Sequence, residues 1–216
     1  MKKWIKKFDF SDDHDHSNPI TSISMTSEGD QVYAGAKSGQ IYLFERRVDG
    51  SWDNTLTWTA NRSIVDAQRH QKISEEVIDT DIFTIQKKSP LLITAGIREI
   101  RIWFISDRYE SCVDKNFEPQ GIQFPTETSR QRFVSANEIS LFQTMYNFSS
   151  VRACQDGLSF GYTEENLVNI RRIDRSESIL SVYKNDGPLT RVDFEPNHYD
   201  VILTGDENGN CSIVDL

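Results

Sequence analysis

The stretch ITSISMTSEGDQVYAGAKSGQIYLF, from Ile20 to Phe44, decides the fold because its pattern returns three times along the chain. The later copies are IDTDIFTIQKKSPLLITAGIREIRIW (residues 78–103), NFSSVRACQDGLSFGYTEENLVNIR (147–171) and LTRVDFEPNHYDVILTGDENGNCSIV (189–214). Each copy has an alternating strand, a polar turn, a second strand that runs into a small residue and Gly, a charged or Gly-rich turn, and a third strand. The copies start about 40 to 70 residues apart, a spacing that indicates a repeat architecture.

The repeats predict an all-β chain, a β-propeller of the WD-repeat type with about four blades of an expected seven or so. An open arc exposes sheet edges, so we expect the chain to be partial or truncated. Gly35, Gly96, Gly161 and Gly205 are interpreted as one shared position that requires either a positive φ or close backbone approach. The expected bounds are blades near 20–58, 78–105, 147–183 and 189–216, an inserted arm at 59–77, and a long loop at 107–145 with one short strand at 121–124.

Charge and cysteine content narrow the class of protein. The net charge is -9, which argues against nonspecific binding to nucleic acid or acidic membranes. The three cysteines are Cys112, Cys154 and Cys211. They are odd in number, far apart and without the spacing of metal ligands, so we interpret them as buried thiols of a reducing compartment. The sequence has neither a membrane-length apolar run nor an apolar stretch behind its basic start, so we expect a cytoplasmic or nuclear protein without membrane contact.

The sequence holds no catalytic motif that we can identify. It has no phosphate-binding loop, no nucleophile elbow and no spaced pair of histidine ligands. The run Asp12-Asp13-His14-Asp15-His16 can chelate a metal only weakly, since structural sites use spaced ligands on rigid elements, and a solvated entry to the first blade is the favoured interpretation. We therefore expect a non-enzyme without cofactor or metal.

Several segments, taken together, resemble one family. They occur in the same order and spacing, from about Trp4 to Leu216, as in the N-terminal half of the WD-repeat regulatory B subunit of protein phosphatase 2A. Arg171 stands where the third blade of that family has a tryptophan, so we expect either a weakened third blade or altered packing there. The segments are LLITAGIREIRIWFISDR (91–108), GIQFP (121–125), Arg132-Phe133 with Ala136-Asn137, TEENLVNI (163–170), Asp174-Arg175-Ser176 and FEPN (194–197).

The resemblance implies a non-catalytic targeting subunit of the phosphatase 2A complex. In that family the propeller holds a HEAT-repeat scaffold subunit through a hairpin arm, works with the catalytic subunit, and presents an acidic groove to phosphoprotein substrates with basic flanks. Carried over to this sequence, the arm is 59–77, with Glu75 and Glu76 as scaffold-binding residues. The substrate groove is assigned to Tyr146, Glu164 and Glu165, on the top face of the third blade.

Two alternatives remain open. One is a generic WD-repeat interaction scaffold that does not bind the phosphatase. The other is a propeller enzyme with its own hydrolytic activity. Co-purification with a phosphatase catalytic subunit separates the first alternative from the targeting subunit, and a hydrolase screen without added phosphatase tests the second.

Overall fold

The computed structural model describes residues 18–60, 65–66, 71–72, 76–83, 91–111, 130–144, 146–196 and 198–216. Within these ranges every regular element is a β-strand, and every strand pairing is antiparallel. The described segments include no helix long and apolar enough to cross a membrane. The all-β prediction is therefore confirmed.

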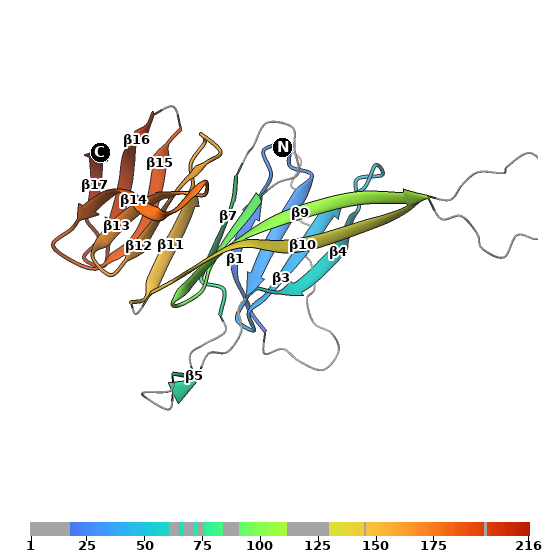
Figure 1. Cartoon of the computed structure of the whole chain (residues 1–216), viewed down its shortest axis with the longest axis horizontal. Helices are drawn as coiled ribbons and strands as arrows, with labels where there is room; N and C mark the ends of the chain where they lie inside the picture. The colour runs from blue at the N-terminus through green and yellow to red at the C-terminus, as the bar shows by residue number, and fades with distance from the viewer. Residues whose placement is uncertain are drawn as a thin grey trace, which may run out of the picture.

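Four sheets follow one another in chain order and are called blades 1 to 4 here (Figure 1). Blade 1 holds β1 (Ile20–Met25), β2 (Gln31–Ala36), β3 (Gln40–Arg46) and β4 (Trp52–Thr59). Blade 2 holds β7 (Asp79–Phe83), β8 (Leu91–Ala95), β9 (Glu99–Ser111) and β10 (Arg130–Gln143). Blade 3 holds β11 (Phe148–Ala153), β12 (Ser159–Glu164), β13 (Leu167–Arg172) and β14 (Arg175–Lys184). Blade 4 holds β15 (Leu189–Glu195), β16 (His198–Asp206) and β17 (Cys211–Asp215).

The core lies between the blades rather than inside one sheet. Alternating strands have two faces, and here each face between neighbouring blades is apolar, so that burial of one sheet against the next stabilises the stack. Between blades 1 and 2, the Trp58 and Trp103 rings pack edge to face with centroids 5.9 Å apart. Similar clusters join blade 2 to blade 3 around Phe160, and blade 3 to blade 4 around Val192.

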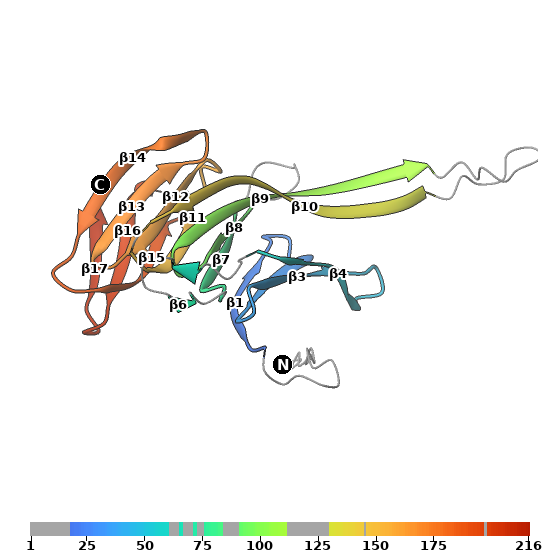
Figure 2. The ribbon, with the colours of Figure 1, turned by 60° about the horizontal axis from the view of Figure 1, so that its bottom comes forward.

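The expectation of a long loop at 107–145 is wrong at both of its ends. Strand β9 continues to Ser111, and β10 begins at Arg130 as the fourth strand of blade 2. Together they form a long hairpin that extends past the other strands of the blade (Figures 1 and 2). The polar composition of β10 was misleading because its apolar residues alternate with polar ones: Val134 and Ala136 pack against the core between blades 1 and 2, while Ser135 between them is exposed. The short strand expected at 121–124 lies outside the described residues.

The four glycines do not share one position. Gly35 lies opposite Ser22 and Gly205 lies opposite Arg191, which are equivalent places in blades 1 and 4. In blade 3 the equivalent residue is Thr163, and Gly161 lies two residues before it in the strand. In blade 2 the equivalent residue is Ala95 rather than Gly96. None of the four has a positive φ, so the turn explanation is wrong for them.

Close approach does explain two of these glycines. A Cβ placed on Gly35 would lie 2.5 Å from Ser22 Oγ of the same blade and 2.6 Å from Cγ1 of Val77, which belongs to the segment leading into blade 2. A Cβ on Gly161 would lie 3.1 Å from Cζ of Phe194 in blade 4. Each glycine therefore leaves room for a side chain of the next blade.

Backbone hydrogen bonds fix the register between consecutive blades. The turns that follow the second strand of each blade, and the connections between blades, all lie at one end of the sheets, which we call the connector face. There a carbonyl of one blade accepts a hydrogen bond from the chain entering the next blade. The pairs are Val77 N–H to the Ala36 carbonyl (3.1 Å), Phe148 N–H to the Ile97 carbonyl (2.8 Å) and Leu189 N–H to the Glu165 carbonyl (2.7 Å).

Candidate functional site

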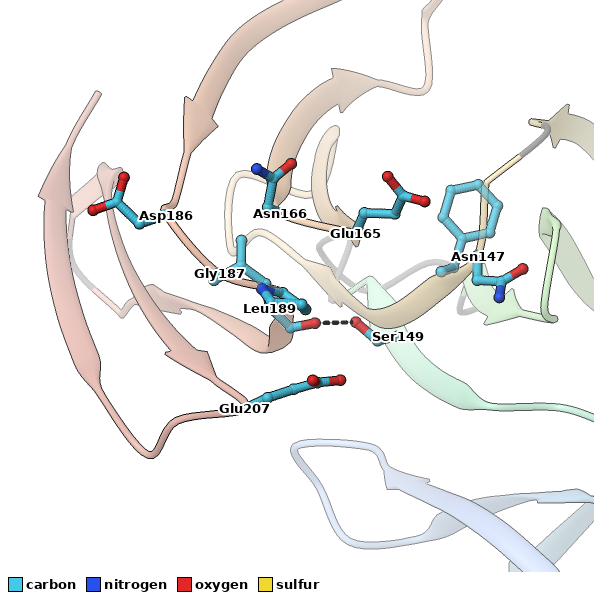
Figure 3. Close-up of a pocket in the computed structure, with 10 residues that line it drawn as sticks. Asn147, Ser149, Glu165, Asn166, Asp186, Gly187, Leu189 and Glu207 are labelled. Carbon is cyan, nitrogen blue, oxygen red and sulfur yellow. Dashed lines mark hydrogen bonds between the residues drawn. The ribbon is translucent and has the colours of Figure 1, made fainter.

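A hollow of about 450 Å³ opens on the connector face between blades 3 and 4. Carboxylates from two turns and one connection between blades surround it, namely Glu165, Glu207 and Asp186 (Figure 3). The described residues that line it include no lysine or arginine; the others are Asn147, Phe148, Ser149, Asn166, Gly187, Pro188 and Leu189. We call this hollow the acidic pocket, and its charge suits a cationic group.

The two neighbouring glutamates predicted to form the groove have different environments. Glu164 ends β12, and both of its carboxylate oxygens are engaged: one accepts a hydrogen bond from the Thr144 hydroxyl and the other from Asn169 Nδ2 at 3.1 Å. Glu165 is exposed at the following turn and lines the acidic pocket. Successive residues of an extended chain point to opposite faces, so Glu164 and Glu165 have different surroundings although they are neighbours in the sequence.

Glu165 also has a left-handed backbone, with φ of 54°, which is uncommon for a residue other than glycine. In this conformation its carbonyl accepts the Leu189 amide of blade 4. The same residue thus joins blades 3 and 4 through its backbone and leaves its side chain at the pocket. Among the described residues no hydrogen bond or ion pair uses this side chain, so it is available to a ligand.

Sequence reasoning missed Asp186 and Glu207. Glu207 could have been found from the repeats, because Glu165-Asn166 and Glu207-Asn208 are equivalent pairs that directly follow β12 and β16. Asp186 lies in the connection from β14 to β15, where no repeat pattern marks it. The pocket exists because turns of two blades and one connection meet at the same face.

The structure places Tyr146 beside this region. It is 52% exposed on the connection between β10 and β11, and its backbone N–H donates to the Thr144 hydroxyl at 3.3 Å. Thr144 in turn donates to Glu164, and Asn147, next along the chain, lines the acidic pocket. The predicted residues Tyr146, Glu164 and Glu165 are therefore close to one another on the connector face, although only Glu165 lines the pocket itself.

Of the two predicted scaffold-binding residues, Glu75 and Glu76, the structure describes only Glu76. Glu76 is half-buried just before Val77, and Glu75 lies outside the described residues. Within the expected arm at 59–77, the structure has a short pairing of β5 (Val65–Asp66) with β6 (Gln71–Lys72). The hairpin of β9 and β10 is the longest one among the described strands.

A second polar cluster joins the first strands of blades 2, 3 and 4. Oδ2 of Asp79 accepts hydrogen bonds from Ser150 Oγ (3.0 Å), Val151 N (3.1 Å), Arg152 Nη1 (2.7 Å) and Arg191 Nη1 (3.0 Å). The Asp79 side chain is only 6% exposed, whereas that of Arg191 is 59% exposed. All four donors converge on one carboxylate oxygen, which marks a structural role in holding the blades together.

Two further groups near the blade interfaces have shifted pKa values. Burial raises the pKa of Asp81, and hydrogen bonds from the Ala153 and Ile82 amides oppose that rise. Burial also raises the pKa of Tyr162, against the nearby charge of Arg171. Arg171 donates from Nε to the Tyr162 hydroxyl at 3.0 Å, and its guanidinium lies 5.4 Å from the Phe142 ring centroid. A cation over aromatic rings thus fills the place where tryptophan was expected.

No metal centre is evident in the part of the chain that the structure describes. There, no three or more histidine, cysteine, aspartate or glutamate side chains come close enough to hold an ion. The run Asp12 to His16 lies outside the described residues. Cys154 is buried and Cys211 is exposed, both as free thiols, while Cys112 is not described.

Comparison with known proteins supports the fold and finds one remote sequence similarity to a protein of described function. No family model matches the chain. It is 19% identical over 236 residues to a Drosophila melanogaster protein described as "Protein phosphatase PP2A 55 kDa regulatory subunit", and the match covers 95% of this chain and 47% of that protein. A solved structure described as "Structure of U3-55K" matches with a TM-score of 0.58 at 13% identity, covering 93% of this chain and 47% of the other.

These matches bear mainly on architecture. At such identity the structural likeness shows the fold alone, and with the four blades it identifies a β-propeller of the WD-repeat type. The chain spans about half the length of the proteins it matches. The predicted fold class is therefore confirmed, while the connection to phosphatase regulation is a distant sequence similarity.

Proposed function

We propose that this chain is a non-catalytic WD-repeat targeting subunit of a phosphatase 2A complex, acting in the cytoplasm or nucleus. The acidic pocket is the observation that carries this proposal. It combines three carboxylates, a volume of about 450 Å³ and an exposed tyrosine nearby, features that suit a basic segment of a phosphoprotein. The similarity to a PP2A regulatory subunit supports phosphatase as the partner class.

In this proposal the pocket acts by charge and shape. Glu165, Asp186 and Glu207 attract a lysine or arginine of the substrate, and exposed ion pairs of this kind contribute about 0.2–1 kcal/mol each. Several such contacts favour encounter and orientation more than tight binding. The substrate's phosphorylated residue then stays outside the pocket and within reach of a catalytic subunit bound to the same complex.

The scaffold contact is proposed for the hairpin of β9 and β10 as well as for the predicted arm at 59–77. A long two-stranded projection reaches a partner without disturbing the blades, and this hairpin extends beyond the rest of its sheet (Figure 2). Glu76 remains a candidate contact at the entry to blade 2. Shortening the hairpin at its tip should abolish capture of a HEAT-repeat scaffold subunit while leaving peptide binding unchanged.

The pocket is tested with a basic phosphopeptide and charge-removing variants. Glu165→Gln, Asp186→Asn and Glu207→Gln together should weaken binding by about 1–2 kcal/mol at low salt, and less at high salt where charges are screened. Glu28→Gln is the matched control, since this exposed carboxylate lies on the β1–β2 turn at the opposite end of the sheets. Glu164→Gln should leave affinity unchanged because that carboxylate is bound by Thr144 and Asn169. Equal affinity of the triple variant and the native chain would reject the pocket.

The phosphatase assignment is tested separately by co-purification. The tagged chain should retain a phosphatase 2A catalytic subunit and a scaffold subunit from a cell extract, and should show no hydrolytic activity without them. Peptide binding without phosphatase would favour the generic interaction scaffold instead. Intrinsic hydrolysis that persists after phosphatase is removed would favour the propeller enzyme.

A further inference from the structure

The carboxylates of the acidic pocket are not held in place by contacts of their own. Glu165, Asp186 and Glu207 are exposed, and among the described residues no hydrogen bond or ion pair uses any of the three side chains. Two of them lie on turns of different blades, and the third lies on the connection between those blades (Figure 3). Like charges repel, so such side chains move apart when nothing fixes the chain beneath them. The pocket therefore depends on how firmly these three segments are joined.

One hydrogen-bond network joins the residues next to the pocket carboxylates. These residues are Asn166, Asn185 and Asp206, each adjacent in the chain to one of the three acids. The Asn185 backbone N–H donates to the Asn166 carbonyl at 2.8 Å, and Asn166 Nδ2 donates to the Asn185 carbonyl at 3.1 Å. Asn185 Nδ2 donates to the Gly187 carbonyl at 3.0 Å and to Asp206 Oδ2 at 3.3 Å. Asn185 thus joins the blade 3 turn, the connection and the blade 4 turn.

Asp206 is itself fixed within the blade 4 turn. Its Oδ1 accepts the backbone N–H groups of Asn208 and Asn210, both at 2.9 Å, and its Oδ2 accepts Asn210 Nδ2 at 3.0 Å. Hydrogen bonds, first of all those from Asn210, lower the pKa of Asp206, so this carboxylate is ionised at neutral pH. The Asn185 amide therefore donates to a charged acceptor, and hydrogen bonds of this kind are stronger than those between neutral groups.

The preceding pair of blades has a related contact. Asn185 directly follows the last strand of blade 3, as Thr144 directly follows the last strand of blade 2. The Thr144 hydroxyl donates to Glu164, which ends β12 as Asp206 ends β16. In both cases the residue after the last strand of one blade binds the carboxylate that ends the second strand of the next blade. At Asn185 this contact between blades coincides with the three segments of the pocket.

We propose that Asn185 is a positioning residue of the acidic pocket, whose amide fixes the two turns and the connection so that their three carboxylates face one cationic side chain together. This inference rests on the proposed function of the pocket. It adds a residue that does not line the pocket and so acts only through the segments it joins. A pocket whose carboxylates are already in place loses less conformational freedom on binding, so the network raises affinity without touching the ligand.

Binding of a labelled tetra-arginine peptide at low salt tests this. Asn185→Leu keeps the approximate size of the side chain and removes its amide, so affinity should fall about threefold or more. Asn185→Ala, which leaves space instead of an apolar group, should show the same loss. Asn18→Leu is the matched control and should keep native affinity, since the Asn18 amide also takes part in three hydrogen bonds at the connector face, but in blade 1. Circular dichroism and urea unfolding check that the variants are folded under the binding conditions.

A double-mutant cycle separates positioning from a general loss of structure. The triple variant Glu165→Gln, Asp186→Asn and Glu207→Gln should bind the peptide about 5–30-fold more weakly than the native chain. Adding Asn185→Leu to it should change affinity no further, because the carboxylates through which Asn185 acts are gone. A loss that persists in that background would overturn the inference. So would native affinity of both Asn185 variants beside a weakened triple variant, which would leave the pocket as a site. A triple variant that binds like the native chain would instead reject the proposed pocket and this inference with it.

Discussion

Replacing Asp79 with alanine should destabilise the chain more than any other single charge removal in its cluster. The carboxylate accepts hydrogen bonds from the Ser150 hydroxyl and the Val151 amide, both fully buried, and each would lose its acceptor at a cost of about 1–3 kcal/mol. Arg152 would lose its buried ion-pair partner but keep its bond to the Val151 carbonyl. Since Arg191 is mostly exposed, its contribution is about 0–1 kcal/mol. The expected total for Asp79→Ala is about 3–5 kcal/mol.

Urea unfolding measures this cost. Fluorescence of the four tryptophans, which include Trp58 and Trp103 packed together between blades 1 and 2, reports mainly the N-terminal half of the chain, and circular dichroism reports all the sheets. If the two transitions coincide, unfolding is two-state and one free energy of unfolding can be derived for each variant. Arg191→Ala is the matched control, expected to cost less than about 1 kcal/mol. If Asp79→Ala costs no more than Arg191→Ala, the carboxylate does not hold the blades together and the reasoning fails.

Three further predictions concern the blade interfaces. Gly35→Ala should cost about 1–3 kcal/mol because the new methyl group would meet Ser22 and Val77, whereas Gly205→Ala at the equivalent place should cost under about 0.5 kcal/mol because its methyl group has room. Equal costs in urea unfolding would contradict close approach. Burial raises the pKa of Asp81, so its contribution to stability is fullest below about pH 4 and is lost as pH rises through the folded-state pKa; Asp81→Asn should remove that component, and parallel pH–stability curves would refute it. Arg171→Lys should lower the free energy of unfolding by about 1 kcal/mol through loss of planar stacking on the aromatic rings, and an unchanged urea midpoint would reject this.

The repeat pattern predicted the blades because strand alternation and polar turns are local signals. The same locality explains the error at β10. Its alternation of Val134 and Ala136 with polar residues is a strand signal, but residues 112–129 separate it from β9, and pairing across such a distance is set by the sheet. The glycine alignment failed because the turn after the second strand differs in length between blades. In blade 3 only Glu165 and Asn166 separate the paired residues Glu164 and Leu167, whereas five residues separate Gly35 from Ile41 and Gly205 from Cys211.

The candidate site was predictable in part. Glu165 lies at the loop end of blade 3, where it was expected, and Tyr146 lies close to it, while their role in substrate binding stays a prediction. The sequence could not predict that Glu164 is hydrogen-bonded within the blade while Glu165 lines the pocket. That difference depends on Thr144 in the preceding connection and Asn169 in the next strand. Asp186 was missed since no repeat aligns it with another acidic residue. Pockets made by several turns depend on how blades pack, and that information is distributed over the whole chain.

The hydrogen bonds between blades use backbone atoms, and this affects how the sequence can change. Val77, Phe148 and Leu189 differ in size, yet each donates its amide to a carbonyl of the preceding blade. A substitution that keeps an amide hydrogen therefore cannot delete this link. Side chains on the blade surfaces can therefore change, as the presence of Arg171 in place of an expected tryptophan illustrates, while the backbone links between consecutive blades are kept. Such a chain can acquire new partners by altering its loops long before its architecture is at risk.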